Sequence, residues 1–154
     1  MLGLTSPVKL RRKAAVLALL TPLTLTACTS DKGPTAAQAG QTLKSHILQL
    51  LKERNAQELT ITDPGGKDIA CADGKAKQTF AATGNDLPER SSETLRSMLL
   101  GALNHVAPYK IVSPDGLDKP IRVSSDSFNT ILVLDSSSSG VYVVSGETTC
   151  LPES

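Results

Sequence analysis

A basic cluster followed by an apolar stretch lies near the N-terminus and limits how much of the chain is left to fold. The basic residues fall within Lys9–Lys13, the apolar stretch covers Ala14–Thr26, and Ala27 precedes Cys28. This order is typical of a secretory signal that is removed from the mature protein. The apolar stretch is too short to cross a bilayer comfortably as a helix. We therefore expect residues 1–27 to be a signal peptide and residues 28–154 to contain one small domain.

The tetrapeptide Leu25–Cys28 (LTAC) resembles the lipobox of bacterial lipoproteins. The resemblance implies that a diacylglycerol is attached to the sulfur of Cys28, that cleavage follows Ala27, and that the new amino terminus is a further acylation site. Two or three acyl chains hold a protein stably at a membrane, because each buried methylene contributes about 0.8 kcal/mol. An ordinary signal that leaves Cys28 as a free thiol is the alternative. The lipobox predicts a lipid anchor at the outer face of the cytoplasmic membrane. The Arg11-Arg12 pair is similar to a twin-arginine signal, but the residues around it do not fit the usual pattern of that signal, so we expect export by the Sec route.

Composition and charge restrict the class of partner. The chain is 40% hydrophobic and 20% charged, with two Phe, two Tyr and no Trp, so we expect a globular core of aliphatic residues and alanine. The four basic residues of the signal leave 12 Lys and Arg against 15 Asp and Glu in residues 28–154. This acidic balance removes the electrostatic basis for binding nucleic acid. The expected partners are the membrane, through Cys28, and an envelope protein or small ligand.

Two cysteines remain in the mature domain, Cys71 and Cys150. An even number of cysteines in an exported domain predicts a disulfide, and only one intrachain pairing is available. In the chain-entropy model a loop of this length contributes about 4–5 kcal/mol. Metal binding by the two thiols is the rival interpretation, but neither a CxxC spacing nor a neighbouring histidine supports it.

Two segments have the apolar spacing of amphipathic helices. The first is expected at Ala36–Arg54, where Thr35 and Gln38 have capping-box spacing. The second follows the Ser91-Ser92 cap. Its apolar stripe is complete, and it consists of Leu95, Met98, Leu99, Ala102, Leu103 and Val106. Leu99 and Leu103 lie in the middle of this stripe, so we expect them in the centre of the core.

Several segments alternate polar and apolar residues or are rich in β-branched residues, as strands are. The expected strands are Glu58–Thr62, Lys75–Thr83, Tyr109–Val112, Ile121–Ser124, Phe128–Leu134 and Val141–Ser145. The serine run before Gly140 is expected to form a hairpin tip. Residues 28–38 are polar and rich in turn formers, which predicts a lipidated N-terminus and flexible tether before a single domain at 39–154.

The two helical segments are similar to each other. Thr42–Ser45 (TLKS) matches Thr94–Ser97 (TLRS), and Leu59–Gly66 (LTITDPGG) matches Tyr109–Gly116 (YKIVSPDG). A duplicated helix-strand-strand unit and a chance similarity of two amphipathic helices both remain open. Either way, the expected fold is α+β, with about five to six antiparallel strands and two helices on one face of the sheet.

Few residues have a spacing that predicts chemistry. We find no nucleophile elbow and no metal-ligand spacing, and Gly65-Gly66-Lys67 lacks the pattern of a phosphate loop. Asp63, Asp68 and Asp73 are expected to be solvated turn residues, with a weak surface cation site as the alternative. We therefore predict no catalytic residue, no metal and no cofactor.

Three residues are the candidate ligand-binding positions. His46 interrupts the apolar stripe of the first helix, so it is either a polar ligand position or a boundary histidine whose ring packs while one nitrogen reaches water. Asp115 and Asp118 belong to the loop 115–119, which with the tip 136–140 is a candidate contact region, because loops on a rigid scaffold often carry recognition. Plain solvated turns are the alternative for both loops.

Three stretches, Ile61–Ile69 (ITDPGGKDI), Lys77–Gly84 (KQTFAATG) and Gly146–Cys150 (GETTC), resemble small exported lipoproteins of actinobacteria, notably streptomycetes. The resemblance covers most of the mature domain and implies export and surface anchoring, but no activity that could be assigned to a residue. We therefore expect a non-enzymatic module of the cell envelope that binds a protein or ligand. A hydrolase or transferase with a dispersed site of acids and His46 is one alternative. A structural role in envelope assembly is the other.

Overall fold

The structure is a computed structural model, and it describes residues 33–113 and 116–153. The signal and the first part of the expected tether, residues 28–32 with Cys28, lie outside the described residues. The first helix, α1, covers Ala36–Glu53. The capping box is present, since Gln38 N donates to Thr35 Oγ1 and the Gln38 side chain accepts from Thr35 N. Residues 35–38, which we expected in the tether, are therefore part of the folded domain.

The second helix, α2, covers Ser92–Leu103 and is capped by Ser91, as the sequence predicts. Val106 was expected to continue its apolar stripe, but the helix ends before it. Val106 lies in the following turn and still packs against the core. Within the described residues, neither helix is long and apolar enough to cross a membrane.

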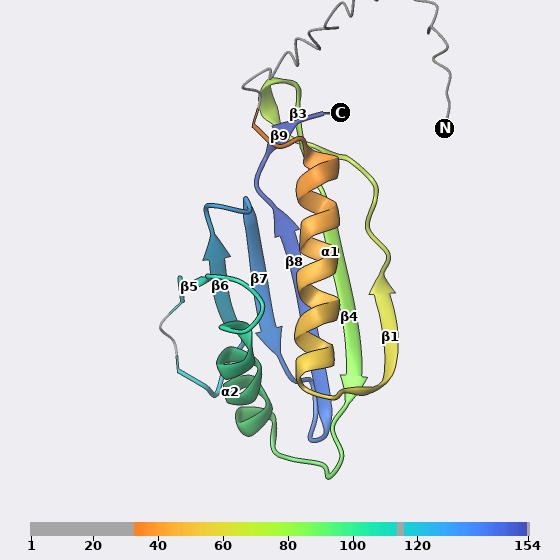
Figure 1. Cartoon of the computed structure of the whole chain (residues 1–154), viewed down its shortest axis with the longest axis vertical. Helices are drawn as coiled ribbons and strands as arrows, with labels where there is room; N and C mark the ends of the chain where they lie inside the picture. Colours follow the sequence, from red (N-terminus) through yellow and green to blue (C-terminus); the bar gives the residue numbers. More distant parts are fainter. Residues whose placement is uncertain (1–32, 114–115, 154) are drawn as a thin grey trace, which may run out of the picture. The chain divides into compact units, whose positions relative to one another are not determined.

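Nine strands complete the described part of the fold (Figure 1). They are β1 (Gln57–Asp63), β2 (Ile69–Ala70), β3 (Lys75–Lys77), β4 (Thr79–Asn85), β5 (Lys110–Ile111), β6 (Ile121–Ser125), β7 (Thr130–Asp135), β8 (Val141–Thr148) and β9 (Leu151–Pro152). Six of them form an antiparallel sheet in the order β1-β4-β8-β7-β6-β5, and both helices lie against the same face of it. The expected α+β class is therefore confirmed.

Each helix is followed in the chain by an edge strand of the large sheet. After α1 comes β1, whose neighbour β4 follows only after β2, a 3₁₀ turn and β3, and after α2 come β5 and its neighbour β6. The two pairs occupy opposite edges of the sheet, with β7 and β8 between them. The β7–β8 hairpin turns at the serine run, as expected. This arrangement agrees with the helix-strand-strand similarity in the sequence, and the duplication itself stays a prediction.

The limits of all the expected strands differ from those in the structure, and two of the differences have a clear local cause. The predicted strand Lys75–Thr83 is divided at Gln78, because β3 pairs with β9 in a small second sheet while β4 pairs with β8 in the large one. At the division, Gln78 N donates to Thr148 Oγ1 and Thr148 N donates to the Gln78 carbonyl. The strand predicted at Phe128–Leu134 begins only at Thr130, because residues 126–129 form a turn in which Asn129 has a positive φ of 53°.

The second sheet has the order β2-β3-β9 and lies beside the Cys71–Cys150 disulfide. Cys71 stands between β2 and the short 3₁₀ turn Ala72–Gly74, and Cys150 directly precedes β9. The predicted disulfide is therefore present in the structure. It joins the segment after β2 to the end of the chain that follows β8.

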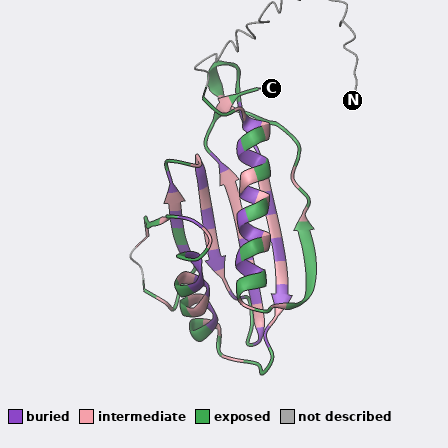
Figure 2. Cartoon of the chain, viewed as in Figure 1, coloured by how far each residue is buried: buried purple, intermediate pink, exposed green. Residues whose placement is uncertain are grey.

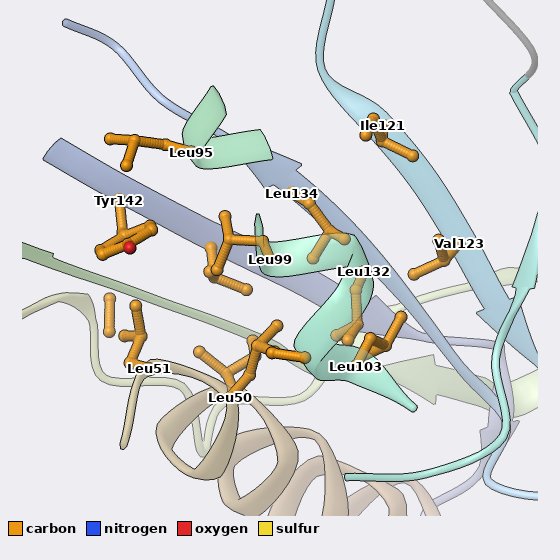
Figure 3. Close-up of a cluster of buried hydrophobic side chains, with 14 of the residues drawn as sticks. Leu50, Leu51, Leu95, Leu99, Leu103, Ile121, Val123, Leu132, Leu134 and Tyr142 are labelled. Carbon is orange, nitrogen blue, oxygen red and sulfur yellow. The ribbon is translucent and has the colours of Figure 1, made fainter. Parts of the chain in front are cut away.

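The core lies between the helices and the sheet (Figures 2 and 3). Both helices contribute leucines that meet Val and Leu residues of β6, β7 and β8 and the ring of Tyr142. The fully buried large side chains are Leu43, Ile47, Leu50, Leu51, Phe80, Leu95, Leu99, Val123, Leu132, Leu134, Tyr142 and Val144. Leu99 and Leu103 are buried, which confirms their predicted place. Burial of such a side chain contributes about 1.5–3 kcal/mol.

Candidate binding surface on the open sheet face

One face of the large sheet is covered by α1 and α2, and the other face is left uncovered within the described residues. Successive residues of a strand point to opposite faces. In β4 and β7 the residues on the helix side are buried and those on the other side are partly exposed. We call this second side the open face. Its described side chains include Asp63, Thr79, Ala81, Thr83, Lys110, Arg122, Ser124, Ile131, Val133, Val143, Ser145 and Glu147.

Strand pairing places five of these residues in one row across the sheet. Asp63 of β1 pairs with Ala81 of β4, Ala81 with Ser145 of β8, Ser145 with Val133 of β7, and Val133 with Arg122 of β6. With about 4.8 Å between neighbouring strands, the row is about 19 Å long. An acid therefore ends the row on one side, a base ends it on the other, and small or apolar residues fill its middle.

The middle of the open face is hollow. The hollow has a volume of about 330 Å³, and Asp63, Ala81, Arg122, Val133 and Ser145 all contribute to its lining. The other lining residues are Thr79, Phe80, Ile131, Gly146 and Glu147. Because Thr79 and Ala81 are small while Ile131 and Val133 are large, the surface is lower over β4 than over β7.

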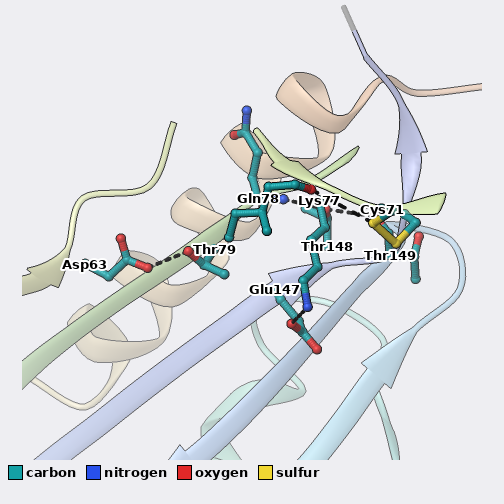
Figure 4. Close-up of polar contacts among 10 residues, drawn as sticks. Asp63, Cys71, Lys77, Gln78, Thr79, Glu147, Thr148 and Thr149 are labelled. Atoms are coloured by element: carbon teal, nitrogen blue, oxygen red, sulfur yellow. Dashed lines mark hydrogen bonds and ion pairs between the residues drawn. A yellow bond between two sulfur atoms is a disulfide. The ribbon is translucent and has the colours of Figure 1, made fainter. Parts of the chain in front are cut away.

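Asp63 is held in place by two hydrogen bonds at the end of β1, of which Figure 4 draws the one from Thr79. Thr79 Oγ1 donates to Asp63 Oδ2 at 2.6 Å, and the backbone N–H of Gly65 donates to Oδ1 at 3.0 Å. These bonds favour the ionised carboxylate and lower its pKa, the bond from Thr79 most strongly. Gly65 has a positive φ of 65° in this turn, which glycine adopts without strain. The acid end of the row is thus a fixed negative charge.

The remaining charges of the open face differ in whether they are paired. Lys77 Nζ lies 2.7 Å from Glu147 Oε2, so these two charges offset each other (Figure 4). Arg122 is exposed and has no ion pair within residues 33–113 and 116–153. The base end of the row is therefore available to an outside carboxylate.

His46 lies on the helix side of the sheet, away from the lining of the hollow. Its ring meets the Phe128 ring edge-on at 4.8 Å between centroids, and its Nδ1 is 2.9 Å from the hydroxyl of Tyr109, which is 2.8 Å from Thr130 Oγ1. Burial lowers the pKa of His46 and raises that of Tyr109. The residue is 9% exposed, so it is a buried, neutral member of a polar network.

Of the two aspartates that the sequence suggested for ligand binding, Asp118 is exposed beside α2 and is not brought to His46. Asp115 lies outside the described residues. The guanidinium of Arg96 on α2 holds the loop at Leu117 and Asp118 in place. It donates to the carbonyls of both residues, and its Nε lies 2.9 Å from the Asp135 carboxylate. The serine tip is also held locally, since Ser136 Oγ donates to the Ser138 carbonyl.

The aspartates considered for a cation site make hydrogen bonds within the chain. Asp63 is bonded to Thr79, and Asp68 accepts a hydrogen bond from the Gln78 amide at 2.8 Å. In the part of the chain that the structure describes, no three His, Cys, Asp or Glu residues are grouped so that they could hold a metal ion.

Sequence reasoning did not identify Arg122 and Ser145 as members of a common surface. Each lies at an alternate position of a predicted strand, which is the signal that could have placed it opposite the core. Their meeting with Asp63 depends on the strand order, which a sequence pattern does not contain.

Comparisons with protein-family models, with curated proteins and with solved structures find no match to this chain.

Proposed function

We propose that this protein is a lipid-anchored extracytoplasmic module that binds an envelope partner through the open face and performs no chemistry. The observation that carries the proposal is the hollow of the open face, with a fixed carboxylate at one end of its central row and the unpaired Arg122 at the other. An uncovered, partly apolar surface with polar ends is typical of a binding site. The lipobox at Cys28 supports the membrane location.

Site-specific photo-crosslinking in the producing bacterium tests the binding surface. A photo-reactive amino acid replaces Val133 on the open face or, as the control, Gln41, which is exposed on α1. We expect crosslinked products from position 133 and few from position 41. Products that arise only from position 41, or from neither position, would contradict the proposal.

The anchor is tested by metabolic labelling with a fatty acid. Cys28→Ser should abolish both the label and membrane retention, because the sulfur of Cys28 is the predicted attachment atom. A labelled and retained Cys28→Ser protein would refute the anchor.

The absence of chemistry is tested on the purified protein. We expect no turnover on panels of hydrolase and transferase substrates. An activity that a single substitution of His46 removes would favour the enzymatic alternative.

A further inference from the structure

We propose that the open face binds a second copy of this chain in a two-fold symmetric pair. The axis runs parallel to β8 and lies between the large sheets of the two copies. The inference rests on the proposed function, because it names the partner of the same surface. A two-fold interface must be complementary to itself, since the same patch serves both subunits. The open face meets this condition in its charges and in the sizes of its side chains.

The charges match because the two ends of the central row lie at equal distances from β8. β1 and β6 are each the second strand away from β8, on opposite sides. Rotation about β8 therefore places Arg122 of each copy opposite Asp63 of the other. The pair forms two equivalent contacts between a base and an acid, neither of which has an ion pair within its own described chain.

The side-chain sizes match for the same reason. β4 and β7 are the immediate neighbours of β8, and they carry the small and the large residues of the open face respectively. The rotation sets Val133 of one copy over Ala81 of the other, and Ile131 over Thr79. The large side chains of each copy thus enter the hollow of its partner, at the spacing of about 10 Å at which stacked sheets pack.

The charges close to the axis do not oppose this pairing. Glu147 lies on β8 and would approach its own copy, but its carboxylate is 2.7 Å from the Lys77 ammonium. Asp135 is paired with Arg96. Lys110 lies on β5, one strand further from the axis than β1, so it extends beyond the edge of the opposing sheet. The charges that decide the orientation are therefore Asp63 and Arg122.

The size of the open face predicts a weak pair that depends on anchoring. A row of about 19 Å and the seven residues of β4, about 23 Å long, give a footprint of roughly 440 Å² per copy. Stable interfaces bury about 800 Å² per partner. Confinement of two anchored copies to one membrane raises their effective concentration, so the pair is expected at the membrane.

Cysteine crosslinking of the full-length protein in its own membrane tests the pair. Ser145→Cys places a thiol on β8, near the axis, and a bismaleimide with a span of about 10 Å should join two copies. Gln41→Cys on the helix side is the matched control and should give little dimer. A crosslink from position 145 to a different protein would overturn this inference but leave the proposed function standing. If the thiol of Ser145→Cys labels freely with maleimide in the membrane and gives no crosslink, both are overturned.

Charge reversal then tests the orientation. In the Ser145→Cys background, Arg122→Glu alone places two acids together, and Asp63→Lys alone places two bases together, so each should reduce the dimer about tenfold or more. Co-expression of the two variants with different tags restores both attractive contacts in a mixed pair, whose yield should return to that of the unreversed protein. A mixed pair no more abundant than either variant alone would refute the proposal.

One control separates charge from stability. Lys52→Glu reverses an exposed charge on α1 and should leave the dimer unchanged. A loss of dimer in Lys52→Glu equal to that in Arg122→Glu would show that the effect is not specific to the open face.

Discussion

At the scale of single residues, close packing explains why position 40 is a glycine. A Cβ added at Gly40 in α1 would overlap the side-chain amide of Gln78, which is buried and donates to Asp68. Gly101 in α2 is a natural comparison, because a Cβ there would meet no atom within 4 Å. The same change in two helices should therefore have opposite effects.

Gly40→Ala should destabilise the protein. Alanine gains about 1 kcal/mol of helix propensity over glycine. Displacing the Gln78 amide from its partner costs about 1–3 kcal/mol, and overpacking adds a similar amount, so the loss should prevail. Gly101→Ala should stabilise the protein by up to about 1 kcal/mol. Urea unfolding of both variants checks this, and a stabilised Gly40→Ala would mean that the contact is loose.

The buried His46 predicts how stability depends on pH. Because burial lowers its pKa below the ordinary value of 6.5, the unfolded chain binds the proton more readily than the folded one. Stability from this residue is therefore fully present above about pH 6.5 and is lost as the pH falls below it. His46→Gln should show a smaller loss between pH 7.5 and pH 5 in urea unfolding. An equal loss in both proteins would contradict the assignment.

At the scale of elements, the helices were predictable and the small sheet was not. The capping box of α1 and the stripe of α2 are local signals, set by residues three or four positions apart. β2 and β9 have two residues each, which is too short to show an alternation. The division at Gln78 arises from its bonds with Thr148, seventy residues away along the chain. Such distant partners cannot be inferred from a local pattern.

The candidate surface could be predicted only in part, because it also depends on residues that are distant in the sequence. The alternation along each strand predicts that the side chains of Arg122 and Val133 point away from the core. It does not predict that Asp63 lies in the same row. That row exists only because β8, the last strand of the large sheet, inserts between β4 and β7. His46 was correctly recognised as a polar break in the stripe, whereas its partners Tyr109 and Phe128 depend on the fold.

The place of Leu99 on α2 predicts a large loss of stability when its side chain is shortened. Leu99→Ala removes a fully buried side chain between the helix and the sheet, and should cost about 2–5 kcal/mol. Leu59→Ala on β1, where the side chain is 48% exposed, should cost less than about 1 kcal/mol. Denaturant unfolding compares them, and similar losses would mean that Leu99 is not central to the core.

At the scale of the whole molecule, the two helices cover one face of the large sheet, and no other element among the described residues covers the opposite face. The disulfide joins the segment after β2 to the chain's end, so the small sheet stays beside the large one. A domain of this kind is suited to present a rigid surface at the membrane to which Cys28 is predicted to anchor it. We therefore expect the open face to be occupied in the envelope.

The accessibility of a thiol on the open face measures this occupancy. Single cysteines replace Ser145 on the open face and Gln41 on α1, and maleimide labelling rates are compared between the purified protein and intact cells. We expect the thiol at position 41 to react at similar rates in both, whereas the thiol at position 145 should react about tenfold more slowly in cells, because a partner covers it. Equal reactivity at position 145 in cells and in the purified protein would contradict the account.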